Sequence, residues 1–301
     1  MRALGSLLTG GGIVAAWLSL AGGRVPALDL LASFLPLFGA MAMLGILLAK
    51  WRRGSAIAAA LLALVPIAIG MAPEWLREIP AAPAGALQVH MLTHNVWSGN
   101  TDPIGTAQAI IDAKPDVVML QELNRNSWPM LAVLNPHFPY STKCPRGCDL
   151  AILSRWPIVR TDYFLKDANG RKFGPAMRLA WIKPPAGEVF MAATLHYPRP
   201  TSGNQAERRR ALAQALARID RDGLIVAGDM NLTPWAAAMR EQDRAFAPLT
   251  RMTRAPSWPR VVPVLPIDHL YAGPDWGLVS TRQLPATGSD HRPILVTLAR
   301  R

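Results

Sequence analysis

The sequence predicts an α/β (α+β) fold: a two-sheet β-sandwich flanked by helices, preceded by three transmembrane helices. Two observations support this. Short apolar runs separated by Pro and Gly turns recur from residue 87 onward, with few helical stretches between them, and many strands with a few helices suggest two packed sheets with helices outside. Three long uncharged stretches precede these runs.

The N-terminal residues 1–73 are expected to form a transmembrane anchor with three helices. Uncharged runs cover residues 3–23, 30–49 and 54–73. A bilayer core of ~30 Å needs about 20 helical residues to cross, and each run reaches that length. A signal peptide is the alternative for the first run, but it does not explain the next two.

The basic residues around these runs predict an orientation. Lys50, Arg52 and Arg53 crowd the second connection, which places that connection in the cytoplasm. The chain after the third helix then lies on the other side. We therefore expect a multi-pass membrane protein whose remaining domain is periplasmic or extracellular, with the bilayer as its partner and no obligate protein partner.

Residues 74–86 are rich in Pro and Ala and are expected to form a linker before a domain at 87–301. Cys144 and Cys148, in Cys-Pro-Arg-Gly-Cys, are the only cysteines. A disulfide across this turn and two free thiols both remain open. The chain carries a net charge of +12, so a polyanion or an anionic membrane surface is a favourable partner.

The domain at 87–301 alternates strand and helix signals. Asp102 before Pro103 predicts a helix at 103–113, and a second helix is expected at 204–219. Strands are expected at residues 87–96, 117–120, 150–153, 159–165, 177–182, 189–195, 224–227, 267–271 and 294–298.

Carboxylates and histidines stand at the ends of several of these runs. Glu122 follows one strand, Asp229 and Asn231 follow another, and Asp290 with His291 precedes the last. Oxygen ligands of this kind suit a hard divalent cation such as Mg²⁺. A histidine beside them suits proton or charge management near neutral pH. The combination indicates metal-assisted attack on a phosphate ester.

Six short motifs together resemble the endonuclease/exonuclease/phosphatase (DNase I-like) family, in the family's order and over roughly residues 87–298. They are Thr93-His94-Asn95-Val96, Leu120-Gln121-Glu122, Thr194-Leu195-His196, Ala227-Gly228-Asp229-Met230-Asn231, Ile267-Asp268-His269 and Gly288-Ser289-Asp290-His291-Arg292-Pro293. The resemblance implies a Mg²⁺-dependent phosphoesterase, with Mn²⁺ as a possible substitute. Its substrate would be a phosphodiester or phosphomonoester in nucleic acid or in a phospholipid headgroup.

The resemblance also implies residue roles. Metal contacts are assigned to Asn95, Glu122 and Asp290, and catalytic roles to His196, Asp229, Asn231, Asp268 and His291. Asn231 and His196 would also bind the phosphate. Trp97 stands where the nuclease branch often has an acidic residue. This departure argues against apurinic-site repair and leaves the number of metals open.

Two other function classes compete with this interpretation. A non-catalytic binding or scaffold module could use the same fold, although none of the six motifs has lost its key residue. A transporter or channel subunit is suggested by the hydrophobic segments. Those segments lack the interior charges that mark transport pathways.

Overall fold

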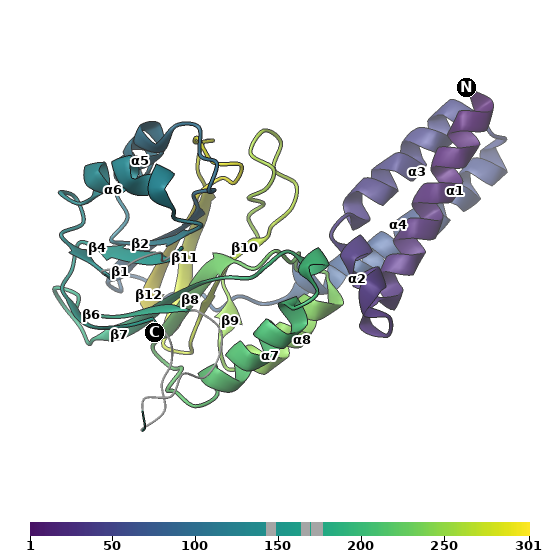
Figure 1. Ribbon diagram of the computed structural model, residues 1–301. Coiled ribbons are helices and arrows are strands. Elements are labelled where there is room, and N and C mark those ends of the chain that lie inside the picture. Colours follow the sequence, from purple (N-terminus) through teal and green to yellow (C-terminus); the bar gives the residue numbers. More distant parts are fainter. Residues whose placement is uncertain (143–148, 164–168, 170–176) are drawn as a thin grey trace. The chain divides into compact units, whose positions relative to one another are not determined.

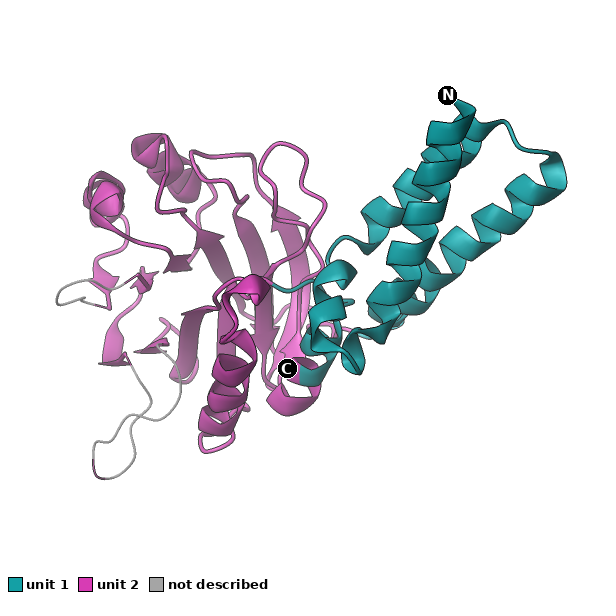
Figure 2. Cartoon of the chain, turned by 45° about the vertical axis from the view of Figure 1, so that its right-hand side comes forward, with its two compact units in different colours: residues 1–78, 232–241 teal, residues 79–231, 242–301 magenta. Residues whose placement is uncertain are grey.

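The computed structural model describes residues 1–142, 149–163, 169 and 177–301. Cys144 and Cys148 lie outside the described residues, so a disulfide and two free thiols both stay open. The chain forms two compact units, one of residues 1–78 with 232–241 and one of residues 79–231 with 242–301 (Figure 2). The domain boundaries drawn from the sequence at 73 and 86 stay a prediction.

The first 78 residues are helical. The elements are α1 (Arg2–Ser19), η1 (Leu20–Gly23), α2 (Pro26–Ala32), α3 (Leu35–Ala49) and α4 (Arg53–Leu76). Two helices, Arg2–Gly23 and Arg53–Leu76, are long and apolar enough to cross a membrane. The predicted second span is a pair of helices, α2 and α3, bent by 64°. Counting this pair as one span gives three.

The bend in the second span has a local cause. Pro36 occupies the first turn of α3, and a proline there has no N–H to extend the preceding helix. The uncharged run 30–49 therefore contains a break that its hydropathy does not reveal.

The second unit is a sandwich of two mixed sheets (Figure 1). The first sheet has the order β11-β12-β1-β2-β4-β3 and the second β5-β6-β7-β8-β10-β9. The strand bounds are β1 (Gln88–Asn95), β2 (Val117–Gln121), β3 (Tyr140–Ser141), β4 (Ala151–Ser154), β5 (Ile158–Asp162), β6 (Arg178–Ile182), β7 (Phe190–His196), β8 (Leu224–Asp229), β9 (Thr250–Arg251), β10 (Asp268–Ala272), β11 (Trp276–Gln283) and β12 (Ile294–Arg300).

The helices of this part are α5 (Pro103–Asp112), η2 (Arg125–Ser127), α6 (Trp128–Leu134), η3 (Pro200–Ser202), α7 (Gln205–Leu216) and α8 (Ala237–Phe246). Asp102 caps α5, accepting a hydrogen bond from the Gly105 N–H at 2.8 Å. In Figure 1, α5 and α6 lie on one side of the sandwich and α7 on the other. The predicted two-sheet fold with flanking helices is confirmed.

The main core lies between the two sheets. Met91 and Met119 of the first sheet and Ile225 and Leu270 of the second are completely buried in it. A second apolar cluster joins the outer face of the first sheet to α5 and α6. β2, β4 and β8 are buried along their whole lengths and appear in the sequence as short apolar runs.

The strand directions bring distant chain segments to one edge of the sandwich. The parallel pairs β1–β2 and β7–β8 end there, with Asn95 opposite Gln121 and His196 opposite Asp229. The antiparallel strand β10 begins at the same edge, with Asp268 opposite Asp229. Gln121 links the sheets beneath this edge, since its Nε2 donates to Thr194 Oγ1 at 2.8 Å.

Candidate active site

Six strands deliver polar side chains to this edge. Asn95 ends β1, Glu122 follows β2, His196 ends β7 and Asp229 ends β8. Asp268 begins β10, while Asp290 and His291 lie just before β12. All eight residues predicted for the site from the sequence, Asn231 included, are linked by contacts of 4.0 Å or less.

Asn95 organises the two central carboxylates. Its Nδ2 donates to Glu122 Oε1 at 3.0 Å and to Asp229 Oδ2 at 2.9 Å. Its Oδ1 accepts from the Trp97 N–H at 2.9 Å. In this orientation the amide presents its donors, rather than its oxygen, to the centre. A direct Asn95–metal bond therefore stays a prediction that requires the opposite amide orientation.

The backbone is unusual at two of these positions. Glu122 and Asn231 adopt left-handed conformations, with φ of 58° and 51°. This region is uncommon for residues other than glycine, and such outliers concentrate at functional sites. Before Asp229, Gly228 has φ of 153°, and a Cβ there would lie 1.9 Å from the Leu195 carbonyl oxygen. Only glycine permits β8 to approach β7 closely enough at this point.

The carboxylates differ in charge state. Burial raises the pKa of Asp229 to about 6, against the opposing effects of His291, His196 and the Asn95 hydrogen bond. Burial also acts to raise the pKa of Glu122. Hydrogen bonds from Asn95 and from the Ser98 N–H, at 3.1 Å, outweigh it and hold that pKa below the ordinary value. Glu122 is therefore the more strongly ionised of the two near neutral pH.

Two histidines face these carboxylates. His196 Nε2 lies 3.6 Å from both Glu122 Oε1 and Asp229 Oδ2. His291 Nε2 lies 3.7 Å from Asp229 Oδ2, while its Nδ1 lies 2.7 Å from Asp268 Oδ2. Burial opposes protonation of His291, but the Asp268 and Asp229 carboxylates raise its pKa to about 10. His291 is therefore a cation at neutral pH.

Glu122, His196 and Asp229 offer ligand atoms that all lie within 4.8 Å of one another. Two carboxylates and one imidazole form a donor set that suits a divalent cation. Asp290 lies outside this trio. Its buried Oδ1 has no hydrogen-bond partner among the residues that the structure describes, and lies 4.0 Å from His291 Nε2. An orphaned carboxylate oxygen at this edge fits the predicted metal role of Asp290.

Three supporting residues carried no assigned role in the sequence. Trp258 Nε1 donates to Asp290 Oδ2 at 3.3 Å. Ser289 Oγ donates to the Asn95 carbonyl at 2.7 Å and accepts from the His291 N–H at 3.0 Å. Ser257 Oγ accepts from the Asp268 N–H at 3.3 Å. Ser289 belongs to a recognisable motif, whereas Ser257 and Trp258 come from a loop without any sequence signal.

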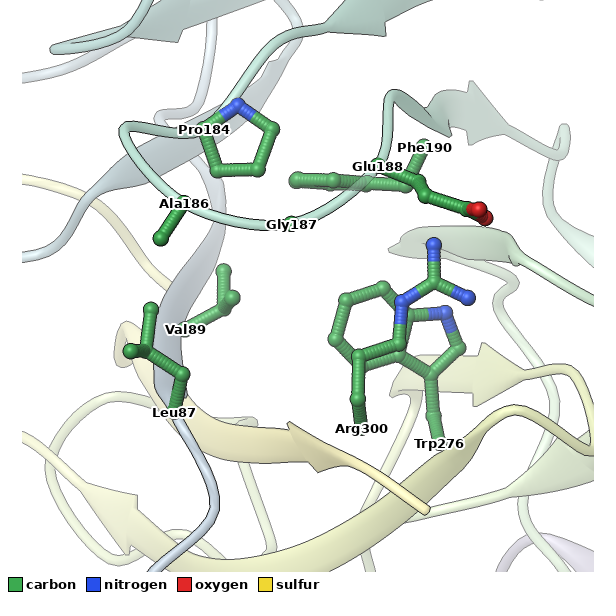
Figure 3. Close-up of a pocket in the computed structure, with 9 residues that line it drawn as sticks. All are labelled: Leu87, Val89, Pro184, Ala186, Gly187, Glu188, Phe190, Trp276 and Arg300. Carbon is green, nitrogen blue, oxygen red and sulfur yellow. The ribbon is translucent and has the colours of Figure 1, made fainter.

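A separate cavity of about 210 Å³ lies at the opposite end of the sandwich (Figure 3). It is formed near the starts of β1 and β7 and the end of β12, far along these strands from the carboxylates. Its lining is largely apolar and comprises Leu87, Val89, Pro184, Ala186, Gly187, Glu188, Phe190, Trp276 and Arg300. This cavity is therefore distinct from the candidate active site.

Residues 92–291 match the Endonuclease/Exonuclease/phosphatase family, and the chain belongs to this family. Its members are phosphoesterase hydrolases. The matched segment contains every residue of the candidate site. Among curated proteins, none matches the chain.

Solved structures share the fold. An endonuclease/exonuclease/phosphatase from Bacteroides vulgatus has a TM-score of 0.58 and 17% identity, covering 71% of this chain and 100% of its own. TDP2 of D. rerio, complexed with single strand DNA product, has a TM-score of 0.55 and 16% identity, with coverages of 70% and 98%. A mutant of beta toxin from Staphylococcus aureus, with bound magnesium ions, has a TM-score of 0.53 and 15% identity, with coverages of 71% and 100%.

Proposed function

We propose that the chain is a Mg²⁺-dependent phosphoesterase, with Mn²⁺ as an alternative metal, that hydrolyses a phosphodiester or phosphomonoester with water as the nucleophile. The observation that carries this proposal is the convergence of Glu122, His196 and Asp229 within 4.8 Å of one another. The ion pair of His291 with Asp268 lies beside them. The magnesium ions bound to the similar beta toxin support the choice of metal.

The proposed role of each side chain follows from its charge. Glu122, with Asp290 and Asn95, would hold the cation, which supplies charge neutralisation at the phosphate. Asp229 accepts hydrogen bonds and, once ionised, can orient or deprotonate the attacking water. His291, protonated and held by Asp268, stabilises negative charge that develops on phosphate oxygens. His196 and Asn231, whose Nε2 and Nδ2 lie 3.4 Å apart, would bind the phosphate.

Hydrolysis of bis(p-nitrophenyl) phosphate by the full chain in detergent tests this proposal. We expect Mg²⁺-dependent turnover that EDTA abolishes, and Glu122→Ala and His291→Ala should each remove most of it. Glu188→Ala, in the distant cavity, is the matched control and should retain activity. Turnover by Glu122→Ala near that of the unaltered chain would exclude the proposed metal role.

Two substrate classes remain in competition. Residues 74–301 hold 27 basic and 19 acidic residues, which favours a nucleic-acid backbone, and the similar TDP2 was complexed with single strand DNA product. A phospholipid headgroup is favoured by the candidate membrane helices. It is also favoured by the loop before β10, where Val261 and Val262 are 75% and 65% exposed beside Arg260.

The dependence of binding and hydrolysis on salt concentration should distinguish these substrates. Binding of a nucleic-acid strand should weaken steeply as salt rises, because each neutralised phosphate releases counterions. Hydrolysis of a zwitterionic headgroup should respond weakly to salt and should fall when Val261 and Val262 are both replaced by Asn. A side-by-side assay of plasmid DNA and phospholipid vesicles at about 50 and 200 mM salt would distinguish the two.

We place the phosphoesterase domain on the side of the membrane opposite Lys50, Arg52 and Arg53, in the periplasm or outside the cell. The start of α2 supports this, since Asp29 Oδ1 accepts a hydrogen bond from the Ala237 N–H at 2.6 Å. This contact favours one side of the membrane for the start of α2 and for residues 232–241. With Cys144 and Cys148 replaced by Ser, an impermeant maleimide should label Ser202→Cys but not Gly54→Cys in intact cells. Labelling of Gly54→Cys but not of Ser202→Cys would show the opposite orientation.

A further inference from the structure

Helix α8 begins without a capping side chain of its own. Its first residues are Ala237 and Ala238, and the residue before them is Ala236. The first N–H groups of any helix lack intrahelical partners and require acceptors. A carboxylate is a favourable acceptor there because it also opposes the positive end of the helix dipole.

Asp29 supplies that acceptor from 208 residues away in the chain. Its Oδ1 accepts from the Ala237 N–H at 2.6 Å, and its Oδ2 accepts from the Ala238 N–H at 2.8 Å. The cap thus uses both oxygens of one carboxylate. Asp29 itself lies in α2, which follows the first candidate membrane span.

A second contact fastens the same segment. Trp235 Nε1 donates to the Ala32 carbonyl oxygen, at the end of α2, at 2.6 Å. Trp235 is 6% exposed, and Ala236 and Met239 are completely buried. Residues 232–241 accordingly form one compact unit with the N-terminal helices, although they interrupt the sequence of the phosphoesterase domain (Figure 2).

This segment starts directly after Asn231, whose backbone is left-handed with φ of 51°. On its N-terminal side Asn231 is well held, because its N–H donates to Asp229 Oδ1 at 2.8 Å and its Nδ2 to the Tyr197 carbonyl at 2.9 Å. An uncommon backbone conformation persists only where its surroundings impose it. On the C-terminal side, the chain continues directly into the segment whose Trp235 side chain and Ala237 N–H are bound by Ala32 and Asp29.

We propose that Asp29 is a positioning residue: by capping α8 it holds the chain that leaves Asn231 and thereby restrains the Asn231 backbone. This inference rests on the proposed function of Asn231 in phosphate binding. It follows that residues 80–301 alone lack part of this restraint, since removing the helices deprives α8 of its cap and Trp235 of its partner.

Gly22 offers a way to move Asp29 without removing its charge. A Cβ at Gly22 would lie 2.6 Å from Asp29 Oδ1 and 2.7 Å from Asp29 Cα. Because one of these contacts is with backbone, a rotamer change cannot relieve it. Gly22→Ala should therefore displace the carboxylate and reproduce the effect of removing it.

The test compares Asp29→Ala, Asp29→Glu and Gly22→Ala with the unaltered full chain in the same detergent. We expect kcat on bis(p-nitrophenyl) phosphate to fall about 10-fold in Asp29→Ala and Gly22→Ala, since small misplacements of catalytic groups cost this much or more. The Mg²⁺ concentration for half-maximal activity should stay unchanged, because the proposed metal ligand Glu122 follows β2 and lies outside the segment that Asp29 holds. Asp29→Glu, which keeps the carboxylate, should recover much of the loss.

Asp220→Asn is the control, since Asp220 accepts the Asp222 N–H at 3.0 Å in an exposed turn outside the unit that contains Asp29 and residues 232–241. Unchanged kcat in both Asp29→Ala and Gly22→Ala would overturn the positioning role. So would a fall in kcat matched by an equal loss of Mg²⁺ activation or of folded protein in thermal melts.

Hydrogen exchange separates failure of this inference from failure of the proposed function. The amides of Ala237 and Ala238 should exchange at least about 10-fold faster in Asp29→Ala, because a lost cap opens the first turn. If the unaltered chain hydrolyses nothing, the proposed function fails but the exchange comparison still decides the cap. Unchanged exchange at both amides would refute it.

Discussion

His291 Nδ1 lies 2.7 Å from Asp268 Oδ2, and this contact joins the two sheets of the sandwich. Asp268 begins β10 in one sheet, while His291 precedes β12 in the other. They lie 23 positions apart in the sequence, and all of β11 lies between them. The pair exists only because both strands start at the same edge, where the other predicted site residues also lie.

Replacing Asp268 by Asn should remove the partner that keeps His291 protonated. We expect kcat/KM to fall about 100-fold, in the range of a lost contact that stabilises negative charge in the transition state. The pKa of His291, raised to about 10 by Asp268 and Asp229, should move down toward its ordinary value, as NMR titration of the ring would record. Asp116→Asn is the matched control, because Asp116 pairs with His90 at 3.0 Å away from the site. Equal losses in both variants would contradict a specific role for Asp268.

Glu122 is the predicted principal metal ligand. Replacing it by Gln keeps the side-chain volume but removes the charge, so Mn²⁺ affinity should fall by more than about 10-fold. Titration of metal-free protein, followed by Mn²⁺ electron paramagnetic resonance, measures this directly. Glu188→Gln, in the distant cavity, should bind Mn²⁺ as the unaltered chain does. Retained affinity in Glu122→Gln would move the metal contact to other residues.

Trp258 holds Asp290 through its indole N–H at 3.3 Å. Trp258→Phe keeps an aromatic ring but removes this donor, which should reduce kcat roughly 3-fold, the scale of one modest hydrogen bond. Trp276→Phe loses a comparable bond, to the Gly223 carbonyl at 3.1 Å, but near the distant cavity. Steady-state kinetics should therefore show a loss for Trp258→Phe alone, and equal kinetics for both variants would argue against the Asp290 link.

Burial of His94 should make the folding stability of the protein depend on pH. Burial lowers the pKa of His94 to about 3, with Asp268 opposing and His291 reinforcing the shift. The unfolded chain takes up a proton below an ordinary pKa of about 6.5, while the folded chain does not until about pH 3. This contribution to stability is therefore complete above about pH 6.5 and is lost as pH falls toward 3. At about pH 4.5 the loss approaches about 3 kcal/mol.

The comparison with His94→Gln isolates this effect, because every other titrating group is shared by both proteins. Urea unfolding in EDTA at about pH 7 and about pH 4.5 should show a larger drop in stability for the unaltered chain than for His94→Gln. Identical drops would mean that the buried imidazole does not govern this range.

The sequence by itself determined the fold class, the strands that carry the six motifs and the identities of the candidate site residues. These features depend on neighbouring residues: continuous apolar runs in strands buried on both faces, a capping Asp102 before α5, and polar residues where runs end. β11 escaped prediction because it is an edge strand, half exposed along its length, and has no apolar run. The break between α2 and α3 was hidden within uniform hydropathy.

Only the tertiary structure decided which polar groups meet. The amide of Asn95 faces two carboxylates from other strands, Trp258 reaches Asp290 from a loop, and Asp29 caps a helix 208 residues away. Such contacts depend on strand register and on the packing of whole elements, which local periodicity does not encode. The local sequence specifies whether a segment forms a strand or a helix, and the three-dimensional arrangement specifies which segments are neighbours.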